Sequence, residues 1–381
     1  MNKTGMGWRM SASVAEAIVA MAACLLGHTT ATSPPHLAVV YERKQWVSQV
    51  QEALTSEWDL VPWAPDLNDS VLQRAEAVVG MVPDELLPKL PNLKLFQSQG
   101  YVTPLEDRAG SSERVIPTGV HVCRGGMGPA AAQYARTIAE WVLGATLDLM
   151  LRLRQTDALM RQCAWSEPTG PPPPECPPSS TFSTRPALMN STLGIVGYGR
   201  VGAAVATLAA PLFGRVVASS PTATGPAPAP LTWWSQSNDD VLRSADALVF
   251  SFADHINATI GLINRTSYRL VKRGAVAVLF VGGAGVDEDA TYDAVADGTL
   301  SGVAINQWWS RYSWRSPRPP GAQWVPPSAR NFAALGDAVL MSPNGCEKSD
   351  VYWAGCATEV AHNLDATAAG LYPCAMDSLE V

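Results

Sequence analysis

The segment that most constrains the fold is a glycine-rich run between an apolar stretch and a helical one. Residues 192–196 have the composition of a buried β-strand, and a G-x-G-x-x-G run follows them directly. Such a run is typical of dinucleotide binding, because its glycines allow a tight turn, close approach of a pyrophosphate and close helix–strand packing. The N–H groups at the start of the next helix suit a phosphate. The same glycines also fit a purely structural turn. The predicted cofactor-binding loop consists of Gly197, Tyr198, Gly199, Arg200, Val201 and Gly202.

The position that contacts the adenosine ribose is unusual. A carboxylate about 20 residues beyond the loop normally accepts the ribose hydroxyls. Here the next strand ends in Ala218-Ser219-Ser220-Pro221, which carries no carboxylate. Ser220 is therefore the predicted ribose contact, and a serine hydroxyl also suits a 2′-phosphate. No arginine follows to neutralise that phosphate, so NAD and NADP both remain open.

Short apolar runs alternate with helical stretches along most of the chain. This rhythm predicts α/β units with parallel sheets, and a long helix over residues 131–154. We expect residues 1–33 to precede the fold, 34–128 (completed by 346–381) to form one domain and 129–345 a second. The expected strands are residues 37–41, 60–63, 77–79, 93–96, 120–122, 192–196, 216–218, 247–250, 275–280 and 302–305.

Composition excludes several classes of protein. The chain has 381 residues, is 47% hydrophobic and carries a net charge of −7. That hydrophobic content is enough for an ordinary core and rules out global disorder. The acidic balance argues against a nucleic-acid partner. No apolar run reaches about 18 residues, which argues against a stable membrane span.

The first 33 residues resemble a targeting leader. Lys3 and Arg9 precede an apolar stretch over residues 17–26, and small residues follow it. Glu16 counts against this interpretation, and a disordered or helical extension is the alternative. A genuine signal peptide directs the chain to the secretory pathway or an organelle; without one, the chain is cytoplasmic.

Sequons and cysteines also bear on the compartment. Beyond the leader, N-x-S/T sequons occur at Asn68, Asn190, Asn257 and Asn264, and Asn190 adjoins a predicted core strand, where a glycan fits poorly. Six cysteines remain beyond the leader. Their spacing matches no zinc pattern, so no metal site is expected. Cysteines scattered over so long a chain are expected to be free.

Several blocks resemble the D-isomer-specific 2-hydroxyacid dehydrogenases, nearest to glyoxylate/hydroxypyruvate reductase-like members. The resemblance runs from about residue 36 to the C-terminus, with insertions near 165–190 and 310–335. It implies a two-domain α/β protein, with a Rossmann nucleotide-binding domain and a flavodoxin-like substrate domain around a cleft. It also implies NAD or NADP, a small 2-hydroxy or 2-oxo acid and a homodimer. The matching blocks are residues 192–202, 261–264, 286–289 and 302–305.

The chain departs from the family where the chemistry is done. Relatives bind the substrate carboxylate with an arginine and exchange a proton through a histidine paired with a glutamate. Gly282 stands where the arginine is expected, Arg311 falls near the glutamate position, and Asn344 stands at the histidine position. Asparagine does not transfer protons at neutral pH. Asn306 replaces an aspartate that contacts the nicotinamide amide, and its side chain still suits that contact.

No intact catalytic set therefore remains, and two functions compete. The first is an NAD(P)-linked oxidoreductase with a remodelled site, for which Arg311 and His255 are the candidate catalytic residues. For Arg311, the alternative is a solvated loop whose tryptophans, Trp308 among them, pack on the domain surface. For His255, the alternative is an ordinary loop histidine. The second is an NAD(H)-binding pseudoenzyme with an interaction or sensing role. A methyltransferase-like loop fits poorly, because the downstream blocks follow the dehydrogenase order.

Overall fold

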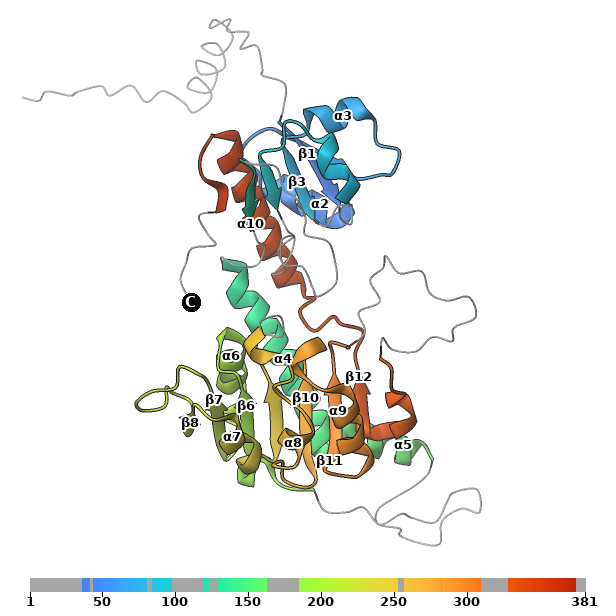
Figure 1. The fold of residues 1–381 in the computed structure, drawn as a ribbon, viewed down its shortest axis with the longest axis vertical. Helices are drawn as coiled ribbons and strands as arrows, with labels where there is room; N and C mark the ends of the chain where they lie inside the picture. The colour runs from blue at the N-terminus through green and yellow to red at the C-terminus, as the bar shows by residue number, and fades with distance from the viewer. Residues whose placement is uncertain are drawn as a thin grey trace, which may run out of the picture.

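The chain forms two parallel β-sheets in separate lobes, each flanked by helices (Figure 1). We describe a computed structural model of the protein. The lobes are connected through α4 (Pro129–Leu151) and α10 (Asp350–Ala368), which contact each other where the chain passes between them. The structure describes residues 36–41, 44–80, 84–97, 119–123, 129–162, 185–252, 257–281, 283–309 and 328–374.

The first sheet has the strand order β2-β1-β3-β4-β5, which is the flavodoxin-like order. Its strands are short and apolar because both faces are covered. Helices α2 and α10 pack on one face, and α3 and η1 pack on the other. All of its strand pairs are parallel. Its elements are β1 (His36–Tyr41), α2 (Lys44–Ala53), β2 (Trp58–Pro62), α3 (Asp69–Arg74), β3 (Ala77–Gly80), the 3-10 helix η1 (Asp84–Lys89), β4 (Leu95–Gln97) and β5 (His121–Cys123).

The second sheet has the order β12-β11-β10-β9-β6-β7-β8 and is also parallel. The six strands β6 to β11, numbered along the chain, follow the Rossmann order. In that order the first and fourth strands, here β6 and β9, are neighbours, and the strand order reverses between them. Its strands are β6 (Thr192–Val196), β7 (Arg215–Ser219), β8 (Trp233–Ser235), β9 (Ala247–Phe250), β10 (Ala275–Leu279), β11 (Leu300–Ile305) and β12 (Val339–Met341).

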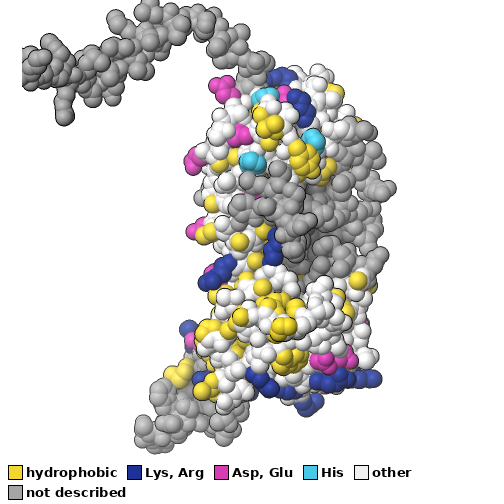
Figure 2. Space-filling view, turned by 90° about the vertical axis from the view of Figure 1, so that its left-hand side faces the viewer, with side chains coloured by type: hydrophobic (Ala, Val, Ile, Leu, Met, Phe, Trp, Pro, Cys, Tyr) yellow, Lys and Arg dark blue, Asp and Glu magenta, His cyan; other side chains and the backbone are white. Residues whose placement is uncertain are grey.

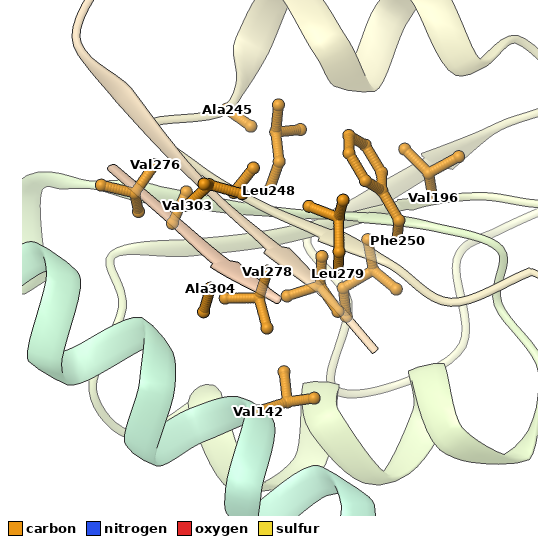
Figure 3. Packing of buried hydrophobic residues seen from close by; sticks show 14 of the residues in the cluster. Val142, Val196, Ala245, Leu248, Phe250, Val276, Val278, Leu279, Val303 and Ala304 are labelled. Carbon is orange, nitrogen blue, oxygen red and sulfur yellow. The ribbon is translucent and has the colours of Figure 1, made fainter. Parts of the chain in front are cut away.

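Helices cover both faces of this sheet and close its core. Val142 of α4 points toward Val278 and Ala304 on the strands (Figure 3), and all three are fully buried. The remaining helical segments are α6 (Arg200–Ala209), α7 (Asn238–Ser244), α8 (Arg265–Tyr268) and α9 (Glu288–Ala296), with 3-10 helices η2 (Leu188–Asn190), η3 (Asn257–Thr259), η4 (Gly283–Gly285) and η5 (Phe332–Ala338).

The long helix expected over residues 131–154 is interrupted. Arg152 adopts the left-handed conformation (φ 57°), which ends α4 and starts α5 (Leu153–Arg161) in a new direction. The turn is stabilised by Asp148, whose carboxylate accepts hydrogen bonds from the backbone N–H of Arg154 (3.1 Å) and from its Nε (2.6 Å). Side-chain contacts therefore cause this break. The apolar periodicity of the sequence continues across residue 152, so it does not show where α4 ends.

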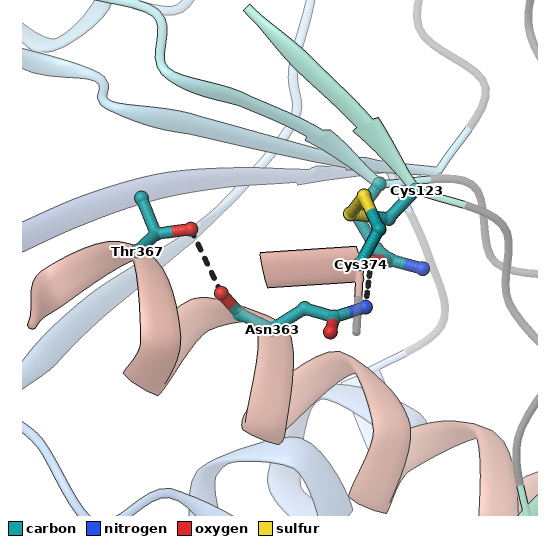
Figure 4. Close-up of a disulfide and its surroundings, with 5 residues drawn as sticks. Cys123, Asn363, Thr367 and Cys374 are labelled. Atoms are coloured by element: carbon teal, nitrogen blue, oxygen red, sulfur yellow. Dashed lines mark hydrogen bonds between the residues drawn. A yellow bond between two sulfur atoms is a disulfide. The ribbon is translucent and has the colours of Figure 1, made fainter. Parts of the chain in front are cut away.

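The expectation that the cysteines are free is wrong for one pair. Cys123, at the end of β5, forms a disulfide with Cys374, which follows α10 (Figure 4). Nearby, Asn363 Nδ2 of α10 donates a hydrogen bond to Gln97 Oε1 of β4 (2.7 Å). A separation of 251 residues hides the pairing from any local spacing pattern. Cys346 and Cys356 are free and buried.

Charges and apolar side chains are mixed on the surface. At the lower end of the face in Figure 2, Lys and Arg side chains lie beside Asp and Glu side chains. The ion pairs of the described residues include Arg265–Asp293 and Lys272–Asp246. In the described part of the chain, no helix is long and apolar enough to cross a membrane. Those residues also contain no cluster of three or more potential metal ligands.

Candidate functional site

The predicted glycine loop lies at the carboxyl end of β6, where the strand order reverses. Gly197 turns the chain with φ 97°, a left-handed value that disfavours side chains. A Cβ on Gly197 would lie 2.7 Å from the backbone carbonyl of Ser251, which follows the neighbouring strand β9. The turn is held by the Ser219 carbonyl, which accepts hydrogen bonds from the N–H groups of Gly197 and Tyr198 (3.0 Å each). Position 197 therefore requires glycine for structural reasons alone.

Gly202 is also required by packing. A Cβ there would lie 2.5 Å from the Gly197 carbonyl oxygen and 3.2 Å from the side chain of Ile195. This contact sets how closely α6 approaches β6. Like Gly197, Gly202 would be needed in any tight strand-to-helix turn, with or without a ligand.

Gly199 differs from the other two glycines. It is the N-cap residue of α6, with φ −100° and ψ −161°, an extended backbone that any residue adopts. A Cβ added there would meet no described atom within 4 Å. No side chain caps the helix, so the N–H groups of its first turn lack a side-chain acceptor among the described residues. Among the described residues, neither the backbone conformation nor the packing requires glycine at this position.

The other loop residues line the same turn. Tyr198, Arg200 and Val201 are each half-buried. The Tyr198 ring meets Trp234 of β8 edge-to-face at 6.3 Å, and burial raises the pKa of its hydroxyl, which is therefore neutral at physiological pH. Through this ring contact, Tyr198 packs the glycine loop against the edge strand β8.

Ser251 supplies a polar atom at the same edge of the sheet. Its hydroxyl is shielded from solvent and has no hydrogen-bond partner among the described residues. The Oγ atom lies 3.4 Å from the position that a Cβ on Gly202 would occupy. Sequence patterns do not single out this serine, because nothing in its neighbourhood marks it. Only the pairing of β6 with β9 brings it beside the loop.

Ser220, the predicted ribose contact, is only 7% exposed at the end of β7. Its hydroxyl is engaged locally: it bonds the Thr222 hydroxyl (2.9 Å) and accepts the Thr222 N–H (3.3 Å). The preceding Ser219 hydroxyl donates to Asn238 Oδ1 (2.7 Å). The strand end therefore offers neutral hydroxyls where a carboxylate is usual.

Asn306, the predicted nicotinamide contact, is fully buried at the end of β11. Its Oδ1 accepts three hydrogen bonds from the loop that leads to α10: from Ser342 Oγ (2.9 Å), Gly345 N (3.1 Å) and Cys346 N (3.1 Å). Its Nδ2 is buried without a partner among the described residues. Asn306 therefore anchors the loop over residues 342–349 that leads to α10, which we call the crossover loop. Only its amide nitrogen remains for another contact.

The loop anchored by Asn306 includes the position where the histidine was expected. Asn344 stands there, exposed and in the left-handed conformation (φ 57°), which asparagine tolerates better than most residues. Glu347, half-buried, and Lys348, exposed, follow in the same loop. The other candidates, Gly282, His255 and Arg311, lie outside the described residues.

The start of the tryptophan-rich stretch packs onto the domain. Trp308 is 6% exposed and donates from Nε1 to the Ser342 carbonyl (2.9 Å). Trp309 donates to the Val286 carbonyl and stacks on Phe332 (5.2 Å, 11° between planes). The rings of these two tryptophans therefore pack on the domain, as the alternative interpretation of this stretch expects.

A family model described as "D-isomer specific 2-hydroxyacid dehydrogenase, NAD binding domain" matches residues 143–340. Among curated proteins, glyoxylate reductase of Thermofilum pendens is 22% identical over 70% of this chain and 70% of its own length. D-3-phosphoglycerate dehydrogenase of Mycobacterium leprae is 27% identical over 62% of this chain but only 40% of its own length. The chain thus spans less than half of that longer relative.

Solved structures share the fold. A D-lactate dehydrogenase from Treponema pallidum superimposes with a TM-score of 0.68, at 18% identity, over 90% of this chain and 98% of its own. One from Aquifex aeolicus, complexed with NAD and lactic acid, gives 0.64 at 19% identity over 88% and 96%. These likenesses confirm the predicted two-domain α/β architecture. With the family model covering more than half of its length, the chain belongs to the D-isomer specific 2-hydroxyacid dehydrogenase family.

Proposed function

We propose that the protein is an NAD(P)-linked oxidoreductase that acts on a small 2-hydroxy or 2-oxo acid through a remodelled active site. The observation that carries this proposal is Gly199, a glycine that neither backbone strain nor packing requires. Open space over an uncapped helix N-terminus fits the diphosphate of a dinucleotide. When bound, the nicotinamide ring supplies the hydride acceptor or donor.

The described residues offer groups that suit such a cofactor. The N–H groups of Arg200, Val201 and Gly202 begin α6 and suit the diphosphate. The unpartnered Ser251 hydroxyl lies beside them. At the end of β7, Ser220 and Thr222 offer hydroxyls to the adenosine ribose. Because no carboxylate stands there to repel a 2′-phosphate, we expect both NAD and NADP to bind.

The proton donor must differ from that of the relatives. Asn344 has no titratable group, so a general acid or base has to come from elsewhere. In the described part of the loop, Glu347 and Lys348 are titratable and follow the anchored backbone of Cys346. We propose to test Glu347 and Lys348 alongside His255 as proton donors, and Arg311 as the group that binds the substrate carboxylate.

Activity is tested by following NADH and NADPH absorbance with a panel of small 2-oxo acids. The proposal predicts turnover with at least one acid and its loss in Arg311→Ala. Replacing the true proton donor, for example by Glu347→Gln, should lower the rate by roughly 10²–10⁴-fold. A chain that stays inert across the panel with both cofactors contradicts the oxidoreductase proposal.

Asn344 also favours a second function. A neutral, exposed asparagine at the histidine position suits a pseudoenzyme that binds NAD(H) without turning it over and uses it to bias domain closure or association. Calorimetry that finds NADH binding without turnover supports this alternative. Absence of nucleotide binding defeats both functions.

We further propose that residues 34–128, completed by 346–381, act as the substrate domain and 129–345 as the nucleotide domain, and that the protein is a homodimer. The contacts of α10 with α2 and β4 support the first assignment. Size-exclusion chromatography with light scattering tests the second, for which a monomeric mass is the contrary result.

A further inference from the structure

The asparagines of the sequons differ in their exposure to solvent and in the hydrogen bonds that their side chains make. A glycan is bulky and polar, so its acceptor amide has to face solvent in the folded protein. The described side chains are those of Asn68, Asn190 and Asn264. Their surroundings separate two that suit a glycan from one that does not.

Asn68 is exposed at the start of α3. Its Oδ1 caps the helix by accepting the Ser70 N–H (2.9 Å), while its Nδ2 donates no hydrogen bond to a described residue. A sugar on Nδ2 would leave that cap intact. The neighbours Asp69 and Ser70 are also exposed, which leaves room for a glycan.

Asn190 is exposed at the end of η2, immediately before β6. The sequence alone predicts that a glycan fits poorly so close to a core strand. In the fold, Ser191 and Thr192 are buried, with 3% and 1% of their surface exposed, but Asn190 itself faces outward. Met189, beside it, is 74% exposed, so this corner of the domain is open.

Asn264 caps the N-terminus of α8. Its Oδ1 accepts the N–H groups of Thr266 and Ser267 in a capping box, and its Nδ2 donates to the Gly261 carbonyl (2.9 Å). It is half-buried, so both ends of this amide serve the fold. Asn264 is accordingly the least suitable of the three acceptors.

The disulfide is an independent observation that points to the same compartment. Cys123 and Cys374 are 0% and 4% exposed and bonded to each other. Structural disulfides form and persist in oxidising compartments such as the lumen of the endoplasmic reticulum, where N-glycans are also attached. The leader-like first 33 residues are the segment that would direct the chain there.

We propose that this protein matures in the secretory pathway and carries N-linked glycans at Asn68 and Asn190. The donor is an oligosaccharide linked to a lipid through a diphosphate. The Asn Nδ2 attacks the anomeric carbon, a C–N bond forms, and the bond from that carbon to the phosphate oxygen breaks. The lipid diphosphate leaves with the bonding electrons, and the amide loses one proton to a base.

The test is to express the full chain, with its own N-terminus, in insect or mammalian cells and to measure its mass before and after peptide-N-glycosidase treatment. We expect a glycan at each of the two positions, the first lost in Ser70→Ala and the second in Asn190→Gln. Ser70→Ala is a matched variant, because it destroys the sequon but keeps Asn68 and its backbone cap. Ser70→Thr should retain the glycan.

A chain recovered from the cytosol without glycans overturns the proposal. So does a secreted chain that has the Cys123–Cys374 bond but is unmodified at both positions. Peptide mapping under non-reducing conditions reports the disulfide in each variant, so a misfolded product is recognised. The outcome is independent of nucleotide binding and of catalysis.

Discussion

The carbonyl oxygen of Ser251 lies 2.7 Å from the point where a side chain on Gly197 would begin. This contact joins the ends of β6 and β9, the two strands between which the strand order reverses. In open α/β sheets the ligand binds outside the carboxyl ends of the strands at such a point. Close packing holds the turn at Gly197, whereas a Cβ on Gly199, at the start of α6, would meet no described atom within 4 Å.

Ser220→Asp should give the protein a preference for NAD(H) over NADP(H). A carboxylate at the end of β7 accepts the ribose hydroxyls of NAD and repels a 2′-phosphate. We expect NADPH binding to weaken by about tenfold or more, which corresponds to about 1.4 kcal/mol, while NADH binding holds or improves. Ser220→Asn is the matched control, since it has the same shape without the charge. Equal weakening of both cofactors by both variants would contradict this assignment.

Asn306→Ala should destabilise the protein. It leaves the buried Cys346 N–H and two further donors of the crossover loop without their acceptor. The expected loss is about 2–4 kcal/mol, measured by denaturant unfolding. Asn306→Asp keeps an acceptor oxygen and should recover much of the loss. If alanine is as stable as the wild type, the loop is not held by this side chain.

Removing the disulfide should lower stability under oxidising conditions only. The bond closes a loop of 251 residues, and the expected loss in a Cys123→Ser/Cys374→Ser variant is about 2–4 kcal/mol. Thermal unfolding with and without reductant measures it. The reductant should destabilise the wild type but leave the double variant unchanged. Sensitivity of the variant to reductant would indicate another bond.

Stability should fall at acid pH in part through Asp365. Burial raises the pKa of its carboxyl, but hydrogen bonds from Ser56 and Thr55 outweigh burial and hold the pKa below its usual range. A depressed folded-state pKa gives stability that is present above the unfolded value of about 3.9 and lost as the pH falls further. Asp365→Asn should therefore lower Tm near neutral pH and cease to matter in strong acid. A constant difference in Tm at every pH would contradict this role.

Much of the fold can be predicted from the sequence, because buried parallel strands appear as short apolar runs. The strands at residues 192–196 and 247–250 are confirmed with the expected bounds. The edge strands β8 (Trp233–Ser235) and β12 (Val339–Met341) were not predicted. Both lie at an edge of the sheet and are only partly buried, so burial does not impose a run of apolar residues on them.

The site is predictable only where its residues are close in the sequence. The glycine loop has fixed spacing, so Gly197 and Gly202 are visible without the fold. Ser251 lies 49 residues beyond Gly202 and reaches the loop only through strand pairing. The partners of Asn306 are 36–40 residues further on, so its role as an anchor has no local signature. Contacts between distant residues require the structure.

The most direct test of the account is a titration with NADH and NADPH, followed by tryptophan fluorescence and by calorimetry. The wild type should bind, and Gly199→Val should fold normally but lose binding, because the added side chain occupies only the open space over the helix. The control is Gly144→Ala, at an exposed helical glycine where an added methyl group also meets no described atom within 4 Å, and it should bind as the wild type does. Undiminished binding by Gly199→Val, or no binding by the wild type, would contradict the claim that the first turn of α6 holds a dinucleotide.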